Sequence, residues 1–233
     1  GTNLTSWREL QTDFSFKYKL GKTVSNFGAD YFNYTLPIDN NGDNFTDLTQ
    51  KHRISLFNKI DFYRKKDREA SILARYLYED RWGGEMHWNP NFRGGDSIYG
   101  ESIYTNRFEV VGKYQLPMKE HVVFSGSYSN HTQNSFYGNT SYNALQQIAY
   151  GQLVWDKNWN LKNTFVTGLV TRYEYYDDNT FATLSTDSIN PANAPNKDLY
   201  PGFFFQNTTE ASEKLKVLSG VRFDYHKKHR LIF

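Results

Sequence analysis

Residues 81–101 hold side chains that suit the capture of a planar, partly polar molecule. This stretch carries five glycines, two tryptophans, one histidine and several charges between two segments that alternate apolar and polar residues. Long loops inside a compact domain are usually either functional or disordered, and Trp, Tyr and Arg favour function because these residue types anchor ligands. Aromatic rings stack on a planar ligand, while arginine and aspartate form hydrogen bonds to its polar edge. We therefore predict a ligand-binding site formed by Trp82, Trp88, Arg93, Asp96, Tyr99 and Tyr137.

A pair of neighbouring carboxylates, Asp177 and Asp178, follows another alternating segment. Calcium prefers carboxylate oxygens, so this pair is a candidate structural calcium site in a loop. The cluster of Asp and Asn residues at 39–47 lacks the spacing of a calcium loop, and a plain turn is the preferred interpretation there. The histidines are scattered, and the glycine pairs lack the strand-to-helix context of a phosphate loop. The expected chemistry is therefore binding without catalysis, and no cofactor is expected apart from that possible calcium.

The composition excludes several classes of protein. The 27 basic and 25 acidic residues nearly balance, which gives no electrostatic attraction to nucleic acid. Cysteine is absent, so a disulfide scaffold, a cysteine zinc site and a thiol nucleophile are excluded. The mean hydropathy is −0.74, yet 18% of the residues are aromatic. A chain that is polar overall but rich in aromatic residues fits a β-sheet with one apolar face and one polar face. Soluble β-sandwiches and membrane β-barrels both contain such sheets.

The elements that carry these side chains are predicted to be strands, because apolar residues recur with a period of two. In 102–115, for example, Phe108, Val110 and Tyr114 share one face while Glu109 and Lys113 share the other. The pattern predicts about ten strands, at 9–20, 23–36, 49–63, 70–80, 102–115, 121–130, 144–155, 161–176, 201–210 and 214–225.

The predicted connections alternate between short and long. Short ones fall near residues 21, 66, 118, 158 and 212, and long ones near 40, 90, 137 and 188. Soluble sandwiches have no reason for this alternation, whereas outer-membrane barrels have short periplasmic turns and long extracellular loops. The expected fold class is therefore all-β, an antiparallel transmembrane β-barrel in the outer membrane of a Gram-negative bacterium, where lipid and lipopolysaccharide surround the chain.

Several motifs resemble the barrel of TonB-dependent outer-membrane receptors of Bacteroidetes-type bacteria, most closely their cobalamin-receptor-like branch. They are RYLYEDRWGGE at 75–85, FRGGD at 92–96, YGESIY at 99–104, YYDDNT at 175–180 and GVRFDY at 220–225. The resemblance implies a 22-stranded barrel whose lumen holds an N-terminal plug. Residues 1–233 are then expected to be an internal part of that barrel, without the plug domain and the remaining strands. Phe233 is accordingly not expected to be the terminal aromatic residue of a complete barrel.

The resemblance also implies a function and partners. The full protein would import a large, scarce nutrient, of the cobalamin (corrinoid) or iron-chelate class, by loop capture and plug-gated passage. Its partners would be the TonB complex, which acts through the plug, the nutrient ligand and a surface lipoprotein acting as a lid.

Two alternatives remain open. A complete ten-stranded barrel would resemble the omptin-type outer-membrane proteases, which need paired aspartates and an Asp–His pair at the outer rim. His87, Asp96, Asp177 and Asp178 lie near predicted outer ends and supply those residue types. A passive porin or an adhesin is the other alternative, although the loop aromatics favour a specific ligand over a water-filled pore.

Overall fold

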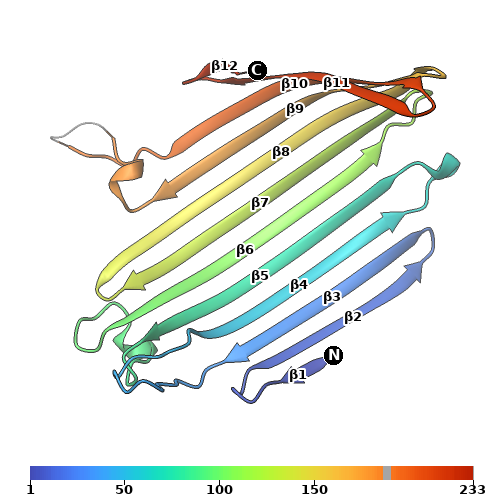
Figure 1. The fold of residues 1–233 in the computed structure, drawn as a ribbon. Coiled ribbons are helices and arrows are strands. Elements are labelled where there is room, and N and C mark those ends of the chain that lie inside the picture. Colours follow the sequence, from blue (N-terminus) through green and yellow to red (C-terminus); the bar gives the residue numbers. More distant parts are fainter. Residues whose placement is uncertain (186–189, 233) are drawn as a thin grey trace.

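A computed structural model describes residues 1–185 and 190–232 of the chain, so Phe233 and part of the predicted loop at 177–200 lie outside the described residues. Twelve strands form one sheet in which each strand is hydrogen-bonded to its neighbours in the sequence, in the order β1 to β12 (Figure 1). All pairings are antiparallel. The predicted all-β, antiparallel class is confirmed at this level. The sheet is open, because β1 and β12 lie at its two opposite edges.

Ten of the strands are long and two are short. The short edge strands are β1 (Thr2–Leu4) and β12 (Arg230–Ile232). The long strands are β2 (Leu10–Leu20), β3 (Thr23–Tyr34), β4 (Gln50–Phe62), β5 (Ala70–Gly84), β6 (Gly100–Gln115), β7 (His121–Tyr137), β8 (Thr140–Asn160), β9 (Asn163–Asp178), β10 (Asn196–Ser212) and β11 (Leu215–His226). Within the described residues, three 3-10 turns lie in the connections: η1 (Lys65–Asp67), η2 (Pro90–Phe92) and η3 (Phe181–Thr183). No helix within the described residues is long and apolar enough to cross a membrane.

The two ends of the sheet differ in their connections. One end, here called the short-turn end, carries the links at 21–22, 63–69, 116–120, 161–162 and 213–214. The opposite end, the long-loop end, carries the long loops 35–49, 85–99 and 179–195 together with the shorter links 5–9, 138–139 and 227–229. The predicted long loop at 131–143 is wrong, because β7 and β8 continue through it to a tight turn at Gly138, where φ is +60°.

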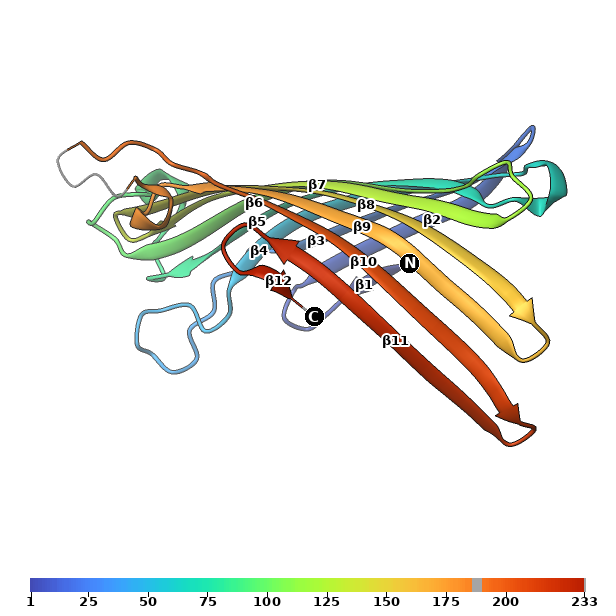
Figure 2. The ribbon, with the colours of Figure 1, turned by 90° about the horizontal axis from the view of Figure 1, so that it is seen from above.

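The sheet is strongly curved. Figure 2 shows both edges on the same side of the central strands, with β10 and β11 bending furthest out of their plane. The sheet therefore has a convex and a concave face. Val24, Val123 and Val170 are among its few buried apolar side chains, and all three lie on the concave face, where side chains converge.

The convex face is apolar and exposed. In the register of β6 and β7, Val110 lies opposite Tyr128, and Tyr114 lies opposite Phe124 on this face. The same face continues across the sheet with exposed large apolar side chains that include Phe14, Phe16, Leu56, Phe62, Ile72, Phe108, Leu153, Trp155, Leu169, Phe203, Phe205, Val221 and Phe223. A contiguous exposed apolar surface of this extent needs an apolar environment.

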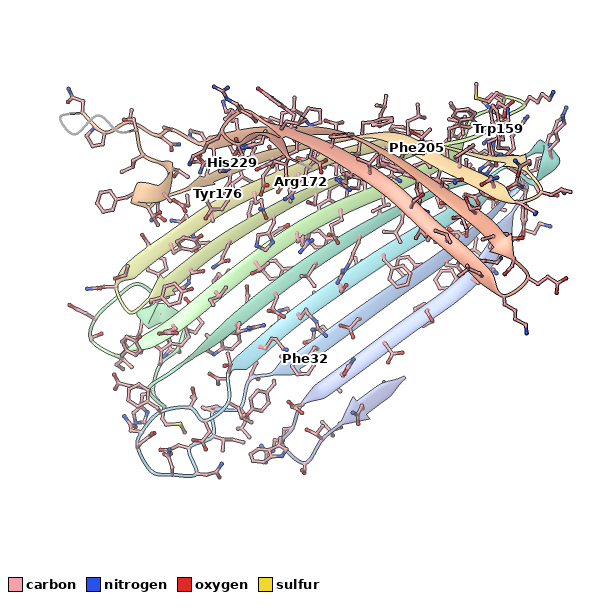
Figure 3. The ribbon with its side chains drawn as sticks, turned by 45° about the horizontal axis from the view of Figure 1, so that its top comes forward. Phe32, Trp159, Arg172, Tyr176, Phe205 and His229 are labelled. Carbon is pink, nitrogen blue, oxygen red and sulfur yellow. The ribbon has the colours of Figure 1, made fainter. Side chains whose placement is uncertain are left out.

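The concave face carries ion pairs between residues of the same or adjacent strands. These pairs are Asp30–Arg53 (2.9 Å), Glu79–Arg81 (2.8 Å), Arg107–Glu109 (2.6 Å), Arg172–Glu174 (2.9 Å) and Arg222–Asp224 (2.7 Å). Figure 3 draws the side chains of both faces and labels Arg172 and Tyr176 from the concave face and Phe205 from the convex one. The sheet thus separates an apolar surface from a charged one, as the period of two predicts.

Candidate ligand-binding rim at the long-loop end

The loop 85–99 folds back over the convex face, with Arg93 as its anchor. The Arg93 guanidinium lies 4.1 Å from the ring centroid of Tyr104 and 4.6 Å from that of Phe136. Its Nε donates to Ser102 Oγ at 2.8 Å, and its Nη2 donates to the carbonyl oxygen of Asn134 at 2.8 Å. Because Ser102 is fully buried, this is a desolvated contact that holds the loop on β6 and β7.

Trp88 fixes the same loop at a second point. Its side chain is only 8% exposed and lies over Gly100, where a Cβ would clash with the indole ring. The backbone N–H of Trp88 donates to the carbonyl of Glu85 at 2.9 Å, and Asn89 caps η2 by accepting from the N–H of Asn91. The structure therefore shows Trp88 and Arg93 as anchors of their own loop, and contact of either with a ligand stays a prediction.

Tyr99 points to the concave side of the rim. Its hydroxyl donates to Glu101 Oε1 at 2.7 Å, its backbone N–H donates to Glu85 Oε1 at 2.7 Å, and its ring centroid lies 6.4 Å from that of Phe45. The hydrogen bond to Glu101, followed by burial, raises the pKa of Tyr99, so the phenol stays protonated and able to donate. The loops 35–49 and 85–99 are joined at this point, because the N–H of Met86 donates to the carbonyl of Asn44 at 2.9 Å.

A cavity of about 470 Å³ lies between the loop 35–49 and the adjoining ends of β5 and β6, and Tyr99 also lines it. Its lining includes Phe45, Arg81, Trp82, Tyr99, Glu101 and Ile103. The lining thus combines aromatic rings, one cation and one carboxylate, which are the groups that hold a planar ligand with polar edges. A volume of 470 Å³ is within the range of small-molecule sites.

The remaining predicted binding residues are placed differently. Tyr137 is exposed at the end of β7 and lies opposite Glu101 in the ladder, so it shares the concave rim with Tyr99. Asp96 is exposed at the tip of its loop and makes no polar contact with the described residues. The structure therefore brings Tyr99 and Tyr137 to one rim on the concave face. Trp82 lies opposite Ser102 in the ladder, so its ring belongs to the convex face, where Trp88 and Arg93 anchor the loop, and Asp96 lies apart.

The candidate calcium pair is divided between the two faces of β9. Asp177 lies opposite Leu145 on the convex face, and Asp178 lies opposite Ala144 on the concave face. Asp178 already accepts from the N–H of Thr180 at 2.9 Å, from the hydroxyl of Thr180 at 2.8 Å and from the hydroxyl of Tyr176 at 2.8 Å. Within residues 1–185 and 190–232, no group of three or more His, Asp or Glu side chains is arranged to hold a metal ion.

Asp178 instead caps the start of the loop 179–195. Burial alone would raise the pKa of Asp178, but the hydrogen bonds from Thr180, Tyr176 and Thr183 outweigh it and lower the pKa below its ordinary value. A carboxylate with a depressed pKa contributes stability above the unfolded-state value of about 3.9 and loses it as the pH falls through the folded-state value. The cap is therefore complete at neutral pH.

We expect Asp178→Ala to loosen the beginning of this loop. The substitution leaves three donors without their acceptor, which costs about 1–3 kcal/mol of local stability. The protection of residues 179–185 against hydrogen exchange should fall at pH 7. Acidification of the unchanged protein to below the folded-state pKa should lower the same protection factors, measured relative to the intrinsic exchange rate at each pH. Asp96→Ala, which removes an exposed carboxylate without partners, serves as the control; equal exchange in both variants would contradict the capping role.

A second polar cluster lies at the long-loop end, outside the predicted site. His226 is only 6% exposed, and its ring stacks on Tyr200 at 4.8 Å and on His229 at 5.1 Å. Its Nε2 lies 3.2 Å from Asp198 Oδ1, and Lys227 Nζ lies 3.0 Å from the same oxygen. These partners lower the pKa of Asp198, Lys227 having the largest effect. No motif in the sequence marks this cluster, because His226 follows Asp198 by 28 residues and the two meet only when β10 and β11 pair.

The sequence matches no known protein-family model, and no curated protein is significantly similar to it.

Proposed function

We propose that residues 1–233 form part of the barrel of a TonB-dependent outer-membrane transporter. The observation that carries the proposal is the division of one curved antiparallel sheet into an apolar convex face and an ion-paired concave face. Lipid requires the first surface, and a water-filled or plugged lumen requires the second. The chain resembles this family in the motifs at 75–85, 92–96 and 220–225.

The height of the apolar surface supports a membrane location. On β4 the convex apolar side chains run from Phe62 to Ile54, and on β5 they run from Ala70 to Tyr78. Nine residues at about 3.3 Å each span roughly 30 Å along a strand, or roughly 22 Å across a bilayer at a tilt of about 45°. This is close to the apolar band of about 25 Å that outer-membrane barrels present to lipid.

The open edges support a larger barrel. A sheet in lipid must close so that every backbone N–H and C=O group is paired, and β1 and β12 each leave one edge without a neighbour among the described residues. We propose that further strands complete a 22-stranded barrel and that a plug domain, which couples to the TonB complex, contacts the charged concave face. A surface lipoprotein would cover the long-loop end.

The rim supports a nutrient with a planar, partly polar surface. Tyr99, Tyr137 and Phe45 offer rings for stacking, while Arg81 and Glu101 offer hydrogen bonds beside them. A corrinoid or an iron chelate has this combination, and both are too large and scarce for passive entry. We propose capture at this rim followed by plug-gated passage, with no chemical change to the nutrient.

Uptake by whole cells tests this function. We expect bacteria that carry the full-length gene to accumulate labelled cyanocobalamin or a labelled ferric siderophore, and to lose accumulation on collapse of the proton gradient or deletion of the TonB protein. The double variant Tyr99→Ala, Tyr137→Ala should weaken binding, with Tyr63→Ala at the opposite end of the barrel as the matched control. Accumulation that needs neither energy nor TonB would indicate a passive porin, and cleavage of peptides by the purified protein would indicate a protease.

A further inference from the structure

A groove of about 530 Å³ crosses the convex face at the short-turn end. Its floor is formed where Ala70 and Gly112 leave room between larger neighbours, and its walls are Phe62, Ile72, Tyr114 and Phe124. Gly112 has no Cβ, and the nearest atom to an added one is a carbonyl oxygen at 4.0 Å, so the space above it is open. The groove is therefore an apolar channel in the surface that the proposed function assigns to lipid.

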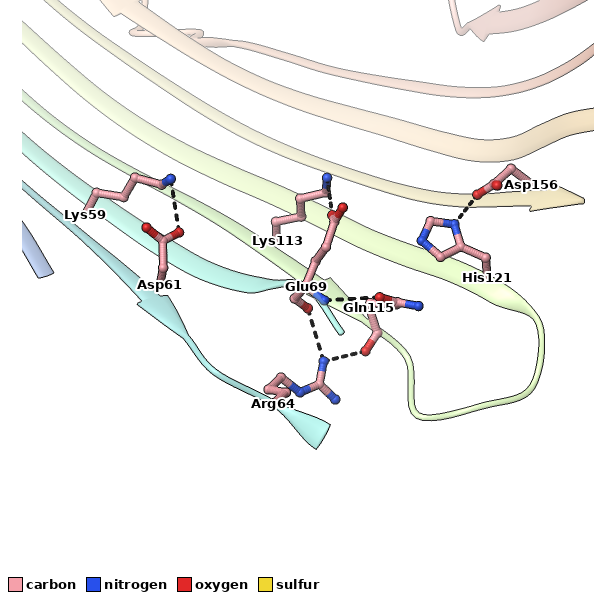
Figure 4. Close-up of polar contacts among 8 residues, drawn as sticks. All are labelled: Lys59, Asp61, Arg64, Glu69, Lys113, Gln115, His121 and Asp156. Atoms are coloured by element: carbon pink, nitrogen blue, oxygen red, sulfur yellow. Dashed lines mark hydrogen bonds and ion pairs between the residues drawn. The ribbon is translucent and has the colours of Figure 1, made fainter. Parts of the chain in front are cut away.

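Cations gather at the mouth of this groove. Arg64 is held in place by hydrogen bonds from its Nη1 to the carbonyl oxygens of Glu69 at 3.1 Å and Gln115 at 2.6 Å (Figure 4). Its guanidinium stacks on Tyr114 at 4.0 Å from the ring centroid. Neither contact neutralises its charge, because its partners are carbonyls and an aromatic ring.

Other charges at the mouth add to this positive field. Lys22 lines the groove, and its ammonium contacts no carboxylate in the described part of the chain. The turn 63–69 also carries Lys65, Lys66 and Arg68, whereas its acidic residues are only Asp67 and Glu69. Glu69 is ion-paired with Lys113 on the other side of the strands (Figure 4). The mouth therefore has an excess of positive charge beside an apolar channel.

We propose that this groove binds one anionic glycerophospholipid of the inner leaflet, with an acyl chain over Gly112 and the phosphate between Arg64 and Lys22. The apolar floor suits a hydrocarbon chain, and the fixed guanidinium at its end suits a phosphate. The inference rests on the proposed membrane location, but it does not depend on which nutrient is carried or on whether transport is energised.

Native mass spectrometry of the full-length protein in a neutral detergent tests the site. Phosphatidylglycerol and phosphatidylcholine with identical acyl chains are titrated in parallel. Both carry the phosphate, but the choline ammonium offsets its charge in phosphatidylcholine, so we expect phosphatidylglycerol to bind about tenfold more tightly beside two cations. The double variant Lys22→Gln, Arg64→Gln should abolish this preference. Gly112→Leu, which fills the channel without a backbone clash, should reduce the binding of both lipids.

Ala149→Leu is the control for the channel, because Ala149 is exposed on the same convex face, opposite Tyr128 and outside the groove lining. Equal binding of the two lipids to the unchanged protein, or equal effects of Gly112→Leu and Ala149→Leu, would overturn the proposal. A protein that shows no energised uptake of nutrient would still be expected to prefer phosphatidylglycerol at this groove. The uptake experiment and the lipid titration therefore test the two proposals independently.

Discussion

Val110→Arg is expected to impair insertion of the barrel into lipid, whereas Val111→Arg is expected to be tolerated. The two valines are neighbours on β6 and point to opposite faces: Val110 lies opposite Tyr128 on the convex face, and Val111 lies opposite Ser127 on the concave face. On β6 the convex apolar side chains run from Tyr114 to Phe108, so Val110 lies near the middle of the apolar band. An arginine at the middle of a lipid-facing surface costs about 2–4 kcal/mol.

Val111 is 47% exposed on the concave face and has the ionic side chains of Glu109 and Lys113 on its own strand. A new arginine there enters a polar surface and needs no desolvation by lipid. Urea titration of the protein folded in phospholipid vesicles measures the two free energies of unfolding under the same conditions. Equal losses in both variants, or a greater loss at Val111, would contradict the assignment of the convex face to lipid.

The apolar alternation was sufficient to predict the strand faces wherever one face is apolar. Phe108 and Val110 were assigned to the same face from their spacing, and the register confirms it. The same criterion failed at 131–143, where β7 and β8 continue with polar residues on both faces, such as Asn134 and Ser135. Strands that extend beyond the apolar band no longer need an apolar side, so periodicity carries no signal there even though the backbone ladder continues.

The rim shows a related limit. Composition predicted that the aromatic and charged residues of 81–101 would lie at the long-loop end, and they do. It did not predict which of them face a partner molecule, because that depends on how the loop folds. Trp88 turns towards β6 because Gly100 leaves room for the indole, and Gly94 leaves room for the Phe136 ring on which the Arg93 guanidinium lies. The same residue types stack on residues of the sheet and on a ligand. Composition alone therefore does not distinguish side chains that anchor the loop from side chains that bind a ligand.

Trp88→Ala is expected to release the loop 85–99 from the convex face. The indole is 8% exposed, and it fills the space left open by Gly100, so its removal creates a cavity that the rigid ladder of β5 and β6 is poorly able to close. Loss of a buried tryptophan costs about 3–5 kcal/mol, which is sufficient to unfold a surface loop locally. Hydrogen exchange and protease cleavage within 85–99 should both accelerate, while the strands keep their protection.

The neighbouring His87 provides the control, because its side chain is exposed and makes no polar contact with the described residues. We expect His87→Ala to leave hydrogen exchange in the loop unchanged.

The comparison of Trp88→Ala with His87→Ala also separates two roles for Trp88. If the indole only anchors the loop, Trp88→Ala lowers both the affinity for the nutrient and the protection of residues 85–99 against hydrogen exchange. Arg93→Ala, which removes the other anchor of the loop, then lowers both quantities as well. If Trp88 instead stacks on the nutrient, binding falls while loop exchange stays as in the His87→Ala protein, and the anchoring role is refuted.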